Sequence, residues 1–287
     1  MTERYISIAS SSATLSAILH TPATDSAADI ADTGVLIIVG GPQYRVGSHR
    51  QFVKLSRALA AQGVASMRLD TAGMGDSSGA KTAFYQQDHD INQAIAAFFQ
   101  HYPQLKKVVL WGLCDAASAI LIKLNQPDPR ISGIILLNPW VRQQHSHATV
   151  MLKHYYLKRL LSRQFWQKAL GGGLALRHSI TELLKTIRQR KPKQSSASVT
   201  PLANEHNYVQ LMLSGWQNFS GKVLLLSSGN DLTAQEFLQL CNDDCAWGAC
   251  LAQAQHKHIA DANHTFASAD WRSQVEQHSY LFIKSTL

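Results

Sequence analysis

The sequence predicts an α/β fold in which a mostly parallel, twisted sheet is flanked by helices. Apolar segments of strand length alternate with helical segments along most of the 287 residues, and such alternation is typical of a parallel sheet covered on both faces. Apolar residues make up 45% of the chain and charged residues 16%. This composition supplies a large core and argues against global disorder.

Each element is predicted from its own local pattern. Residues 35–39 form a continuous apolar run bounded by glycines, which indicates a strand buried on both faces. Phe52, Leu55 and Leu59 recur at helical spacing, and Gly63 follows as a helix-ending residue. The same criteria predict strands at 5–8, 14–20, 35–39, 64–70, 107–111, 131–137, 222–227 and 256–260, and helices at 49–62, 88–99, 116–124, 233–240 and from residue 271.

The alternation breaks once, between residues 140 and 221, where the sequence is helical, basic and irregular. We therefore predict a core formed by residues 1–139 and 222–287, with residues 140–221 inserted between two late strands as a helical cap. From Arg142 to Lys193 the insertion carries twelve Lys or Arg residues and one acidic residue, Glu182.

Two interpretations of this charge stay open. It is either an ordinary solvated helical face or a surface that attracts an anionic partner. The candidate partners are an acidic polysaccharide, a carrier bearing phosphopantetheine, and an anionic membrane surface. No nucleic-acid-binding motif accompanies the charge, so nucleic acid is not an expected partner.

The sequence also predicts a cytoplasmic location. No apolar stretch is long enough to span a bilayer, and the first residues have neither the basic nor the apolar region of a signal peptide. The four cysteines, Cys114, Cys241, Cys245 and Cys250, are then expected to be free thiols in a reducing compartment.

The segment WGLCDA, residues 111–116, has the pattern of a nucleophile elbow. A strand leads to small residues, Gly112 and Ala116, that flank Cys114, and a helix follows at once. This turn is strained and crowded, so its flanking residues must be small. The following helix offers its first N–H groups to a developing oxyanion. The alternative for Cys114 is a buried structural cysteine at the end of a strand.

The loop GGPQYR, residues 40–45, follows the strand at 35–39, where an oxyanion-binding loop is expected. Pro42 has no N–H to donate. Gly41 is therefore the first candidate for the oxyanion hole, together with the N–H of Asp115, and Gln43 is the reserve. The Asp115 side chain would place a carboxylate beside a thiolate, unless it caps the helix or turns to solvent.

The partners of Cys114 are expected downstream, at the carboxyl ends of later strands. Asp231 follows the strand at 222–227, and His264 follows the last strand. Asp243 and Asp244 compete with Asp231 for the role of the acid, but their positions are typical of solvated helix ends. The sequence therefore predicts a Cys114–His264–Asp231 triad.

Cys241, Cys245 and Cys250 with His256 and His258 are a candidate zinc cluster. Their spacing lacks the paired C-x2-C knuckle of zinc sites, and a helix with core cysteines explains the same pattern. No metal and no cofactor are expected.

The stretches VGGPQYRVGSHRQF, RLDTAGMGDSSG, LWGLCDAASA and DANHTF together resemble the exosortase A system-associated hydrolases, a bacterial family of the α/β-hydrolase superfamily. The resemblance covers nearly the whole chain. It implies an α/β-hydrolase fold, a cysteine nucleophile, and a bacterial source that makes exopolysaccharide and has an associated protein-sorting system.

These features predict an esterase- or thioesterase-like hydrolase that acts on an acyl-bearing small molecule or carrier. In this prediction Cys114 forms a thioester that His264, oriented by Asp231, helps to release. Two alternatives remain: acyl transfer with the same triad, and a non-catalytic protein that binds an anionic partner through the basic cap.

Overall fold

The structure is a computed structural model that describes residues 1–11, 13–23, 31–142 and 202–286. The chain divides into one unit of residues 1–146 and 203–287 and a second of residues 147–202. The predicted cap residues 143–201, with most of their basic side chains, lie outside the described residues.

The described strands are β1 Thr2–Ala9, β2 Thr14–Thr21, β3 Thr33–Ile38, β4 Ser66–Asp70, β5 Lys107–Leu113, β6 Ile131–Leu137, β7 Lys222–Ser228 and β8 Gln255–Ile259. The described α-helices are α1 Gln51–Ala61, α2 Asp88–His101, α3 Asp115–Lys123, α7 Tyr208–Asn218, α8 Leu232–Asp243, α9 Cys245–Gln253 and α10 Ala269–Thr286.

All eight strands form one sheet in the order β1-β2-β4-β3-β5-β6-β7-β8. The pairs β1–β2 and β2–β4 are antiparallel, and every later pair is parallel. The predicted α/β class with a mostly parallel sheet is therefore confirmed. Strand β5, which leads to Cys114, lies inside the sheet between β3 and β6.

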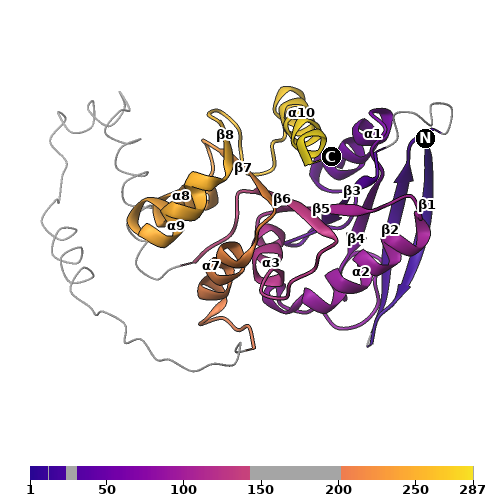
Figure 1. Cartoon of the computed structure of the whole chain (residues 1–287), viewed down its shortest axis with the longest axis horizontal. Helices are drawn as coiled ribbons and strands as arrows, with labels where there is room; N and C mark the ends of the chain where they lie inside the picture. Colours follow the sequence, from indigo (N-terminus) through magenta and orange to yellow (C-terminus); the bar gives the residue numbers. More distant parts are fainter. Residues whose placement is uncertain (12, 24–30, 143–201, 287) are drawn as a thin grey trace, which may run out of the picture. The chain divides into compact units, whose positions relative to one another are not determined.

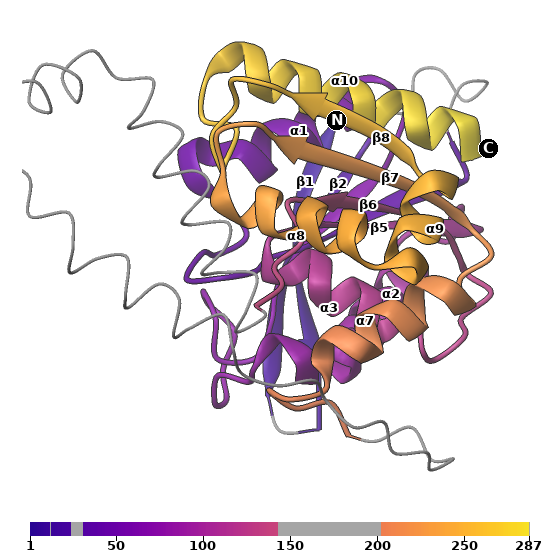
Figure 2. The same cartoon turned by 90° about the vertical axis from the view of Figure 1, so that its left-hand side faces the viewer.

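Helices cover both faces of the sheet in the 1–146 and 203–287 unit. Helices α1 and α10 lie on one face, and α2, α3, α7, α8 and α9 lie on the other (Figures 1 and 2). Alternate residues of the central strands supply the two cores: Val109 and Trp111 of β5 pack toward α1 and α10, whereas Val108 and Leu110 pack toward α2 and α3. This double coverage explains why these strands are continuous apolar runs.

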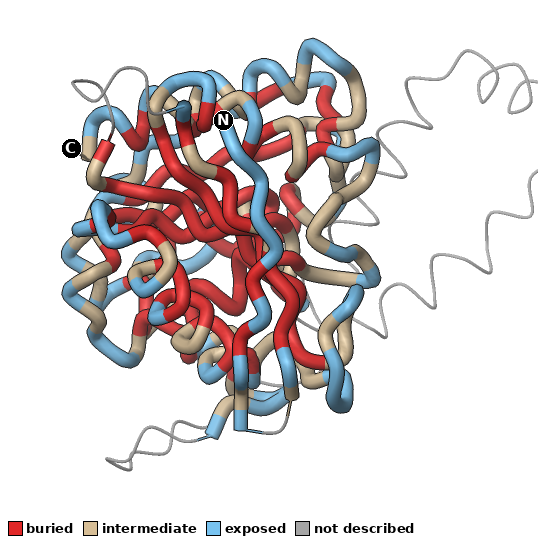
Figure 3. Tube along the Cα trace, turned by 90° about the vertical axis from the view of Figure 1, so that its right-hand side faces the viewer, coloured by how far each residue is buried: buried red, intermediate tan, exposed pale blue. Residues whose placement is uncertain are grey.

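Burial follows the same pattern (Figure 3). The central strands are buried along their length, whereas edge strand β1 is buried only at Ile6 and Ile8. Edge strand β8 is exposed at four of its five residues.

Helix α7 lies within the range 140–221 and packs on α3. The Nδ2 of Asn125 donates to the carbonyl of Leu211 at 2.8 Å. A Cβ on Gly215 would lie 1.8 Å from the carbonyl oxygen of Leu121, so only glycine permits this approach of the two helices. None of the helices in the described ranges is long and apolar enough to span a membrane.

Two local features differ from the sequence prediction. Helix α1 begins at Gln51 and not at residue 49, because His49 and Arg50 adopt positive φ angles of 54° and 58° in a 3-10 turn. A separate helix, α9, follows α8, because Asp244 accepts hydrogen bonds from the N–H groups of Ala246 and Trp247 and starts a new helix.

Candidate active site

Cys114 lies at a sharp turn between the end of β5 and the start of α3. Its φ is 63° and its ψ is −126°, a conformation that costs an ordinary residue about 1–3 kcal/mol. The turn is held on several sides. The Cys114 N–H donates to the carbonyl of Leu137 at 2.9 Å, and its carbonyl accepts from the N–H groups of Ala117 and Trp140. The thiol-bearing residue is half-buried and therefore reachable from solvent.

The small residues around the turn have a steric reason. A Cβ on Gly112 would lie 2.8 Å from backbone atoms of both Ala116 and Ala117, so any other residue would push α3 away from β5. Ala116 itself is fully buried. The elbow pattern in the sequence thus corresponds to a close strand–helix contact.

The structure brings His264 and Asp231 together. The Nδ1 of His264 lies 2.9 Å from Oδ2 of Asp231, although the two residues follow different strands. A Cβ on Gly229 would lie 1.9 Å from the carbonyl oxygen of Ala260. The loops after β7 and β8 can approach this closely because residue 229 is glycine.

Asp231 is fixed by its position at the start of α8. Its Oδ1 accepts the Thr233 N–H at 3.3 Å and its Oδ2 the Ala234 N–H at 3.1 Å, and the side chain is only 8% exposed. The competing acids are engaged elsewhere: Asp244 caps α9, and Asp243 accepts from Gln239. Of the three acids, only Asp231 contacts His264 in the described structure.

The electrostatics of His264 favour its protonated form. Burial alone would lower the pKa of His264, but hydrogen bonds to Asp231 and Cys114 and the charges of both partners outweigh burial and raise the pKa to about 10. Because Nδ1 faces Asp231, the interaction with Cys114 falls to Nε2.

A further positioning group is Asn138, whose role the sequence prediction missed. The fully buried Asn138 donates from Nδ2 to the Ser228 hydroxyl at 2.8 Å and to the His264 carbonyl at 3.0 Å. Its Oδ1 accepts the Ser228 N–H. Asn138 thereby ties the ends of β6 and β7 to the backbone of His264. The only signal in the sequence is an Asn-Pro pair at the end of a strand.

Two of the predicted oxyanion groups, the N–H groups of Gly41 and Asp115, influence the pKa of the Asp115 carboxyl. Burial raises the pKa of this carboxyl, while the backbone N–H groups of Gly41, Ala116 and Asp115 and the charge of Lys81 act in the opposite direction. The reserve candidate, Gln43, accepts the Ser48 N–H on its Oε1 at 3.1 Å. Gly41 has a φ of 64°, and a Cβ there would meet nothing within 4 Å.

An ion-pair network joins the loops after β3 and β4. The Arg45 guanidinium contacts both Asp70, whose side chain is fully buried, and the exposed Asp76. Asp70 also accepts the N–H of Asp76 at 3.1 Å. The motifs GGPQYR and LDTAGMGDSSG therefore hold each other in place, with Gly41 in the loop that Arg45 anchors.

The described residues contain no group of three or more His, Cys, Asp or Glu side chains arranged to hold a metal ion. This includes the candidate zinc cluster, all of whose residues are described. Cys241 and Cys250 are buried, Cys245 is exposed, and all four cysteines are free. Burial raises the pKa of the Cys241 thiol to about 12 and also raises that of Cys250.

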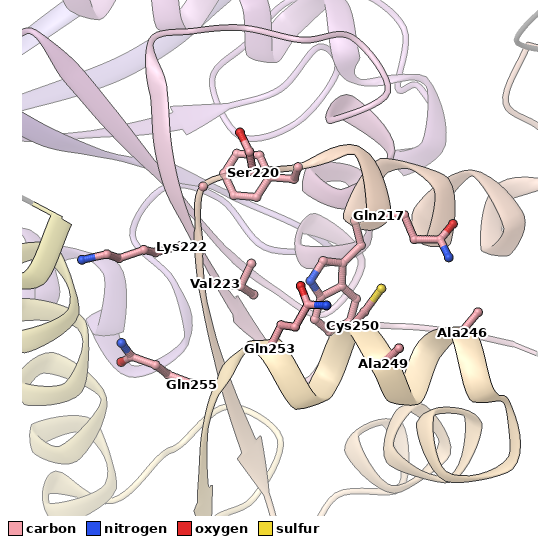
Figure 4. Close-up of a pocket in the computed structure, with 12 residues that line it drawn as sticks. Gln217, Ser220, Lys222, Val223, Ala246, Ala249, Cys250, Gln253 and Gln255 are labelled. Carbon is pink, nitrogen blue, oxygen red and sulfur yellow. The ribbon is translucent and has the colours of Figure 1, made fainter.

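A pocket of about 430 Å³ lies away from these residues. It is bordered by the end of α7, the start of β7 and α9, and Figure 4 shows Gln217, Cys250 and Gln253 around it. The pocket adjoins the amino ends of β7 and β8. Asp231 and His264 follow the carboxyl ends of the same two strands, so the pocket lies at the opposite end of these strands. It is not part of the candidate site.

Comparison with known protein families shows which family the chain belongs to. A family model described as serine aminopeptidase, S33, matches residues 33–233, which is more than half of the chain. The chain belongs to this family. The match includes Cys114 and Asp231 and ends before His264. This S33-family protein carries a cysteine at its elbow, whereas the family description names a serine. No curated protein matches the chain.

Solved structures with the same fold are known. An esterase from Pyrococcus furiosus is 13% identical with a TM-score of 0.63, covering 99% of this chain and 91% of that one. Est1E from Butyrivibrio proteoclasticus with ferulic acid bound is 14% identical with a TM-score of 0.62, covering 98% of each chain. An acylaminoacyl peptidase from Pyrococcus horikoshii is 15% identical with a TM-score of 0.63, and the match covers 42% of that chain. These likenesses show the fold of the chain, which is an α/β-hydrolase fold.

Proposed function

We propose that this protein hydrolyses an ester or thioester with Cys114 as the nucleophile, His264 as the proton carrier and Asp231 as the orienting acid. The observation that carries the proposal is the 2.9 Å contact of His264 Nδ1 with Asp231 Oδ2, together with the place of Cys114 among the groups that raise the pKa of His264. It is supported by the strained elbow that presents Cys114 and by the esterase-like fold.

The first half of the reaction starts from a Cys114 thiolate paired with a protonated His264. The Cys114 thiolate attacks the acyl carbon and forms a C–S bond while the carbonyl π electrons move to oxygen. The tetrahedral intermediate collapses, the bond to the leaving group breaks, and the Nε2 proton of His264 passes to the departing alkoxide or thiolate. The products of this half are an acyl-Cys114 thioester, an alcohol or thiol, and a neutral imidazole.

The second half regenerates the enzyme. Once Cys114 is acylated, it no longer contributes a negative charge that holds the proton on His264. The neutral imidazole then accepts a proton from water as the water attacks the thioester. Release of the acid restores the thiolate and the imidazolium. Asp231 keeps Nε2 directed at the reacting atoms throughout.

Esters and thioesters suit this site better than amides. A thiolate is a good nucleophile but also a good leaving group, so an intermediate formed from an amide reverts unless the amine is protonated efficiently. Alkoxide and thiolate leaving groups make a smaller demand on His264. We therefore expect turnover of short-chain esters and thioesters, with the thioesters turned over faster.

The test of the nucleophile is selective alkylation at neutral pH. Iodoacetamide in limiting amount should label Cys114 ahead of Cys245, the other accessible thiol, because only Cys114 is paired with an imidazolium. His264→Ala should slow labelling of Cys114 and leave Cys245 as an internal control. Equal labelling of the two thiols in both proteins, read by peptide mass spectrometry, would contradict an activated nucleophile.

The test of the reaction is turnover of a panel of aryl esters and acyl thioesters of two to twelve carbons. Cys114→Ala should abolish turnover, and Cys245→Ala should leave it unchanged. Turnover that survives in Cys114→Ala would assign the activity to another group. Absence of turnover with every substrate, in protein whose Cys114 is reactive, would favour acyl transfer or binding.

The biological setting is also a proposal. Similarity of four motifs to the exosortase A system-associated hydrolases supports a role beside exopolysaccharide export. The basic segment from Arg142 to Lys193 supports an anionic partner, either an acidic polysaccharide or a membrane surface. Co-purification with exosortase components from a native source would test the first point, and salt-dependent sedimentation with anionic vesicles or acidic polysaccharide would test the second.

A further inference from the structure

Two histidines of edge strand β8 direct a ring nitrogen at the same hydroxyl group. The Nε2 of His256 lies 2.7 Å and the Nδ1 of His258 lies 2.9 Å from Oγ of Ser227. Ser227 belongs to the adjacent strand β7 and is only 1% exposed, whereas both histidines are exposed. None of the three residues takes part in the proposed triad.

The cluster follows from the pairing of the two strands. In their parallel register Leu225 is opposite His256, and Ser227 is opposite His258. Side chains alternate between the two faces of a sheet, so the two rings and the hydroxyl share a face while Lys257, between the histidines, points to the other. The positive charge of the lysine is therefore directed away from the rings. Strand β8 ends the eight-stranded sheet, so its outer edge has no strand partner in the described structure.

The hydroxyl holds both rings in position. A serine hydroxyl has one proton and two lone pairs, so it donates to one ring nitrogen and accepts the N–H of the other. Both hydrogen bonds form in this way only while both rings are neutral. The neutral imidazole is also the form that binds metal ions. The folded chain thus presents two neutral imidazoles that converge on one point.

The spacing of the rings suits two ligands of one metal ion. A zinc–nitrogen bond is about 2.0–2.1 Å long, so two imidazoles on one ion have ring centres roughly 5–6.5 Å apart. The ring centres of His256 and His258 are 6.4 Å apart, with an angle of 72° between the ring planes. This value is at the upper end of the range, and a small rotation of the exposed rings shortens it.

We propose that Nε2 of His256, Nδ1 of His258 and Oγ of Ser227 bind one divalent transition-metal ion, with water in the remaining positions. Imidazole ligands suit Zn²⁺, Cu²⁺ and Ni²⁺. On binding, the ring that donates its N–H to Ser227 transfers this proton through solvent to its other nitrogen, which frees a lone pair for the metal. Ser227 keeps its proton and contributes a lone pair of its oxygen.

This site differs from the zinc cluster considered from the sequence. It uses no cysteine, and Cys241 and Cys250 are buried in α8 and α9. It also has fewer ligands than a structural zinc site, in agreement with the absence of any group of three His, Cys, Asp or Glu ligands among the described residues. Two imidazoles and a hydroxyl bind a metal more weakly than four protein ligands do and leave positions open for water.

Zinc titration tests the site. The titrated protein carries Cys114→Ala and Cys245→Ala, because these two thiols are accessible and thiolates bind zinc themselves. Isothermal titration calorimetry should show a tightest site of one Zn²⁺ per chain. Replacing either ligand, by His256→Gln or His258→Gln, should weaken this site about 100-fold or more, and Ser227→Ala should weaken it about tenfold.

The matched control is His89→Gln, at an exposed histidine of α2, which should leave the tightest site unchanged. Absence of zinc binding would overturn the proposal, as would an affinity that survives His256→Gln or His258→Gln. An equal loss in His89→Gln would show adventitious binding to surface histidines only. One ion for every two chains would show that a second copy of the chain, and not Ser227, supplies the further ligands.

A second measurement needs no substitution at the site. Cu²⁺ is paramagnetic, so in substoichiometric amount it should broaden the assigned ring-proton NMR signals of His256 and His258 before those of the other histidines. Simultaneous broadening of all histidines would contradict a defined site. Both measurements are independent of the hydrolase function, because the protein used for them lacks the Cys114 thiol.

Discussion

At the scale of single residues, the state of His264 is decided by what each of its ring nitrogens contacts. The Asp231 carboxylate on Nδ1 and the nearby Cys114 together overcome burial and raise the pKa of the imidazole to about 10. The 34% exposed side chain still reaches solvent, which the proposed activation of water requires. Asp231 is held by hydrogen bonds from the first N–H groups of α8, and the backbone of His264 is held by a hydrogen bond from Asn138.

Asp231→Asn tests this arrangement. The Asn side chain keeps an oxygen to cap α8 but removes the charge that stabilises the imidazolium. We expect the pKa of His264, followed by NMR of its ring protons, to fall from about 10 toward its ordinary 6.5 and kcat to drop about 10³- to 10⁴-fold.

The matched control is Asp244→Asn, because Asp244 caps α9 in the same way and does not contact His264. It should leave both readouts unchanged. Loss of turnover in Asp244→Asn with normal turnover in Asp231→Asn would show that the acid is misassigned.

At the scale of elements, the two loops that frame the elbow are held by one buried charge pair. Asp70 ends β4 inside the core with its side chain fully buried, and Arg45 reaches it from the loop after β3. Desolvation makes such a pair a modest source of stability when it is complete and a large cost when one partner is removed.

Arg45→Ala should therefore lower the free energy of unfolding by about 3–5 kcal/mol, because Asp70 stays buried without its cation. Urea unfolding followed by tryptophan fluorescence measures the difference. Asp76→Ala removes the 67% exposed partner of the same arginine and should cost less than about 1 kcal/mol. Equal effects of the two substitutions would show that burial of Asp70 does not set the cost.

A second pair of elements carries a buried titratable group. His20 on β2 is fully buried beside Arg68 of β4, whose Nε donates to His20 Nε2 at 3.1 Å. Burial, assisted by the charge of Arg68, lowers the pKa of His20 to about 4. The unfolded chain takes up this proton below about pH 6.5 and the folded protein only below about 4. The stability that neutral His20 contributes is thus fully present above pH 6.5 and is lost as the pH falls toward 4.

The loss between pH 6.5 and 4 attributable to His20 should be about 3 kcal/mol. His20→Gln keeps an acceptor for Arg68 and does not titrate, so its unfolding free energy should depend less on pH in that interval. His89→Gln, at an exposed histidine of α2, should follow the wild-type curve. A His20→Gln curve parallel to wild type would contradict the buried neutral histidine.

At the scale of the whole molecule, the charge is concentrated in one segment of the sequence. The twelve cations between Arg142 and Lys193 exceed the net charge of +8 of the entire chain. Many weak contacts to a polyanion are screened over about 8 Å at physiological ionic strength. The proposed triad, in contrast, is held by the turns that directly follow β5, β7 and β8.

Neutralising Lys158, Arg159, Arg163, Arg188, Arg190 and Lys191 together should weaken binding to anionic vesicles or acidic polysaccharide and spare hydrolysis of a small neutral ester. Sedimentation at low and high salt measures the binding, which should fall steeply with salt in the unmodified protein. If that protein binds neither partner at low salt, the charge serves solvation only.

Local patterns in the sequence were sufficient for the class of fold and for most elements. Apolar runs of strand length and helical spacing are set by which faces are covered, and each is visible within ten to fifteen residues. Gly112 and Ala116 marked the elbow because crowding at a strand–helix turn acts within five residues. The order Cys114, Asp231, His264 followed from the strand ends at which those residues lie.

Only the tertiary structure decided which groups meet. That Asp231 and not Asp243 or Asp244 contacts His264 depends on the approach of the loops after β7 and β8, which are distant from each other in the sequence. The same holds for Asn138 beside His264, for Arg45 on Asp70, and for His256 and His258 around Ser227. These contacts join residues through the packing of separate strands and loops, and no local periodicity records which side chains such packing brings within hydrogen-bonding distance.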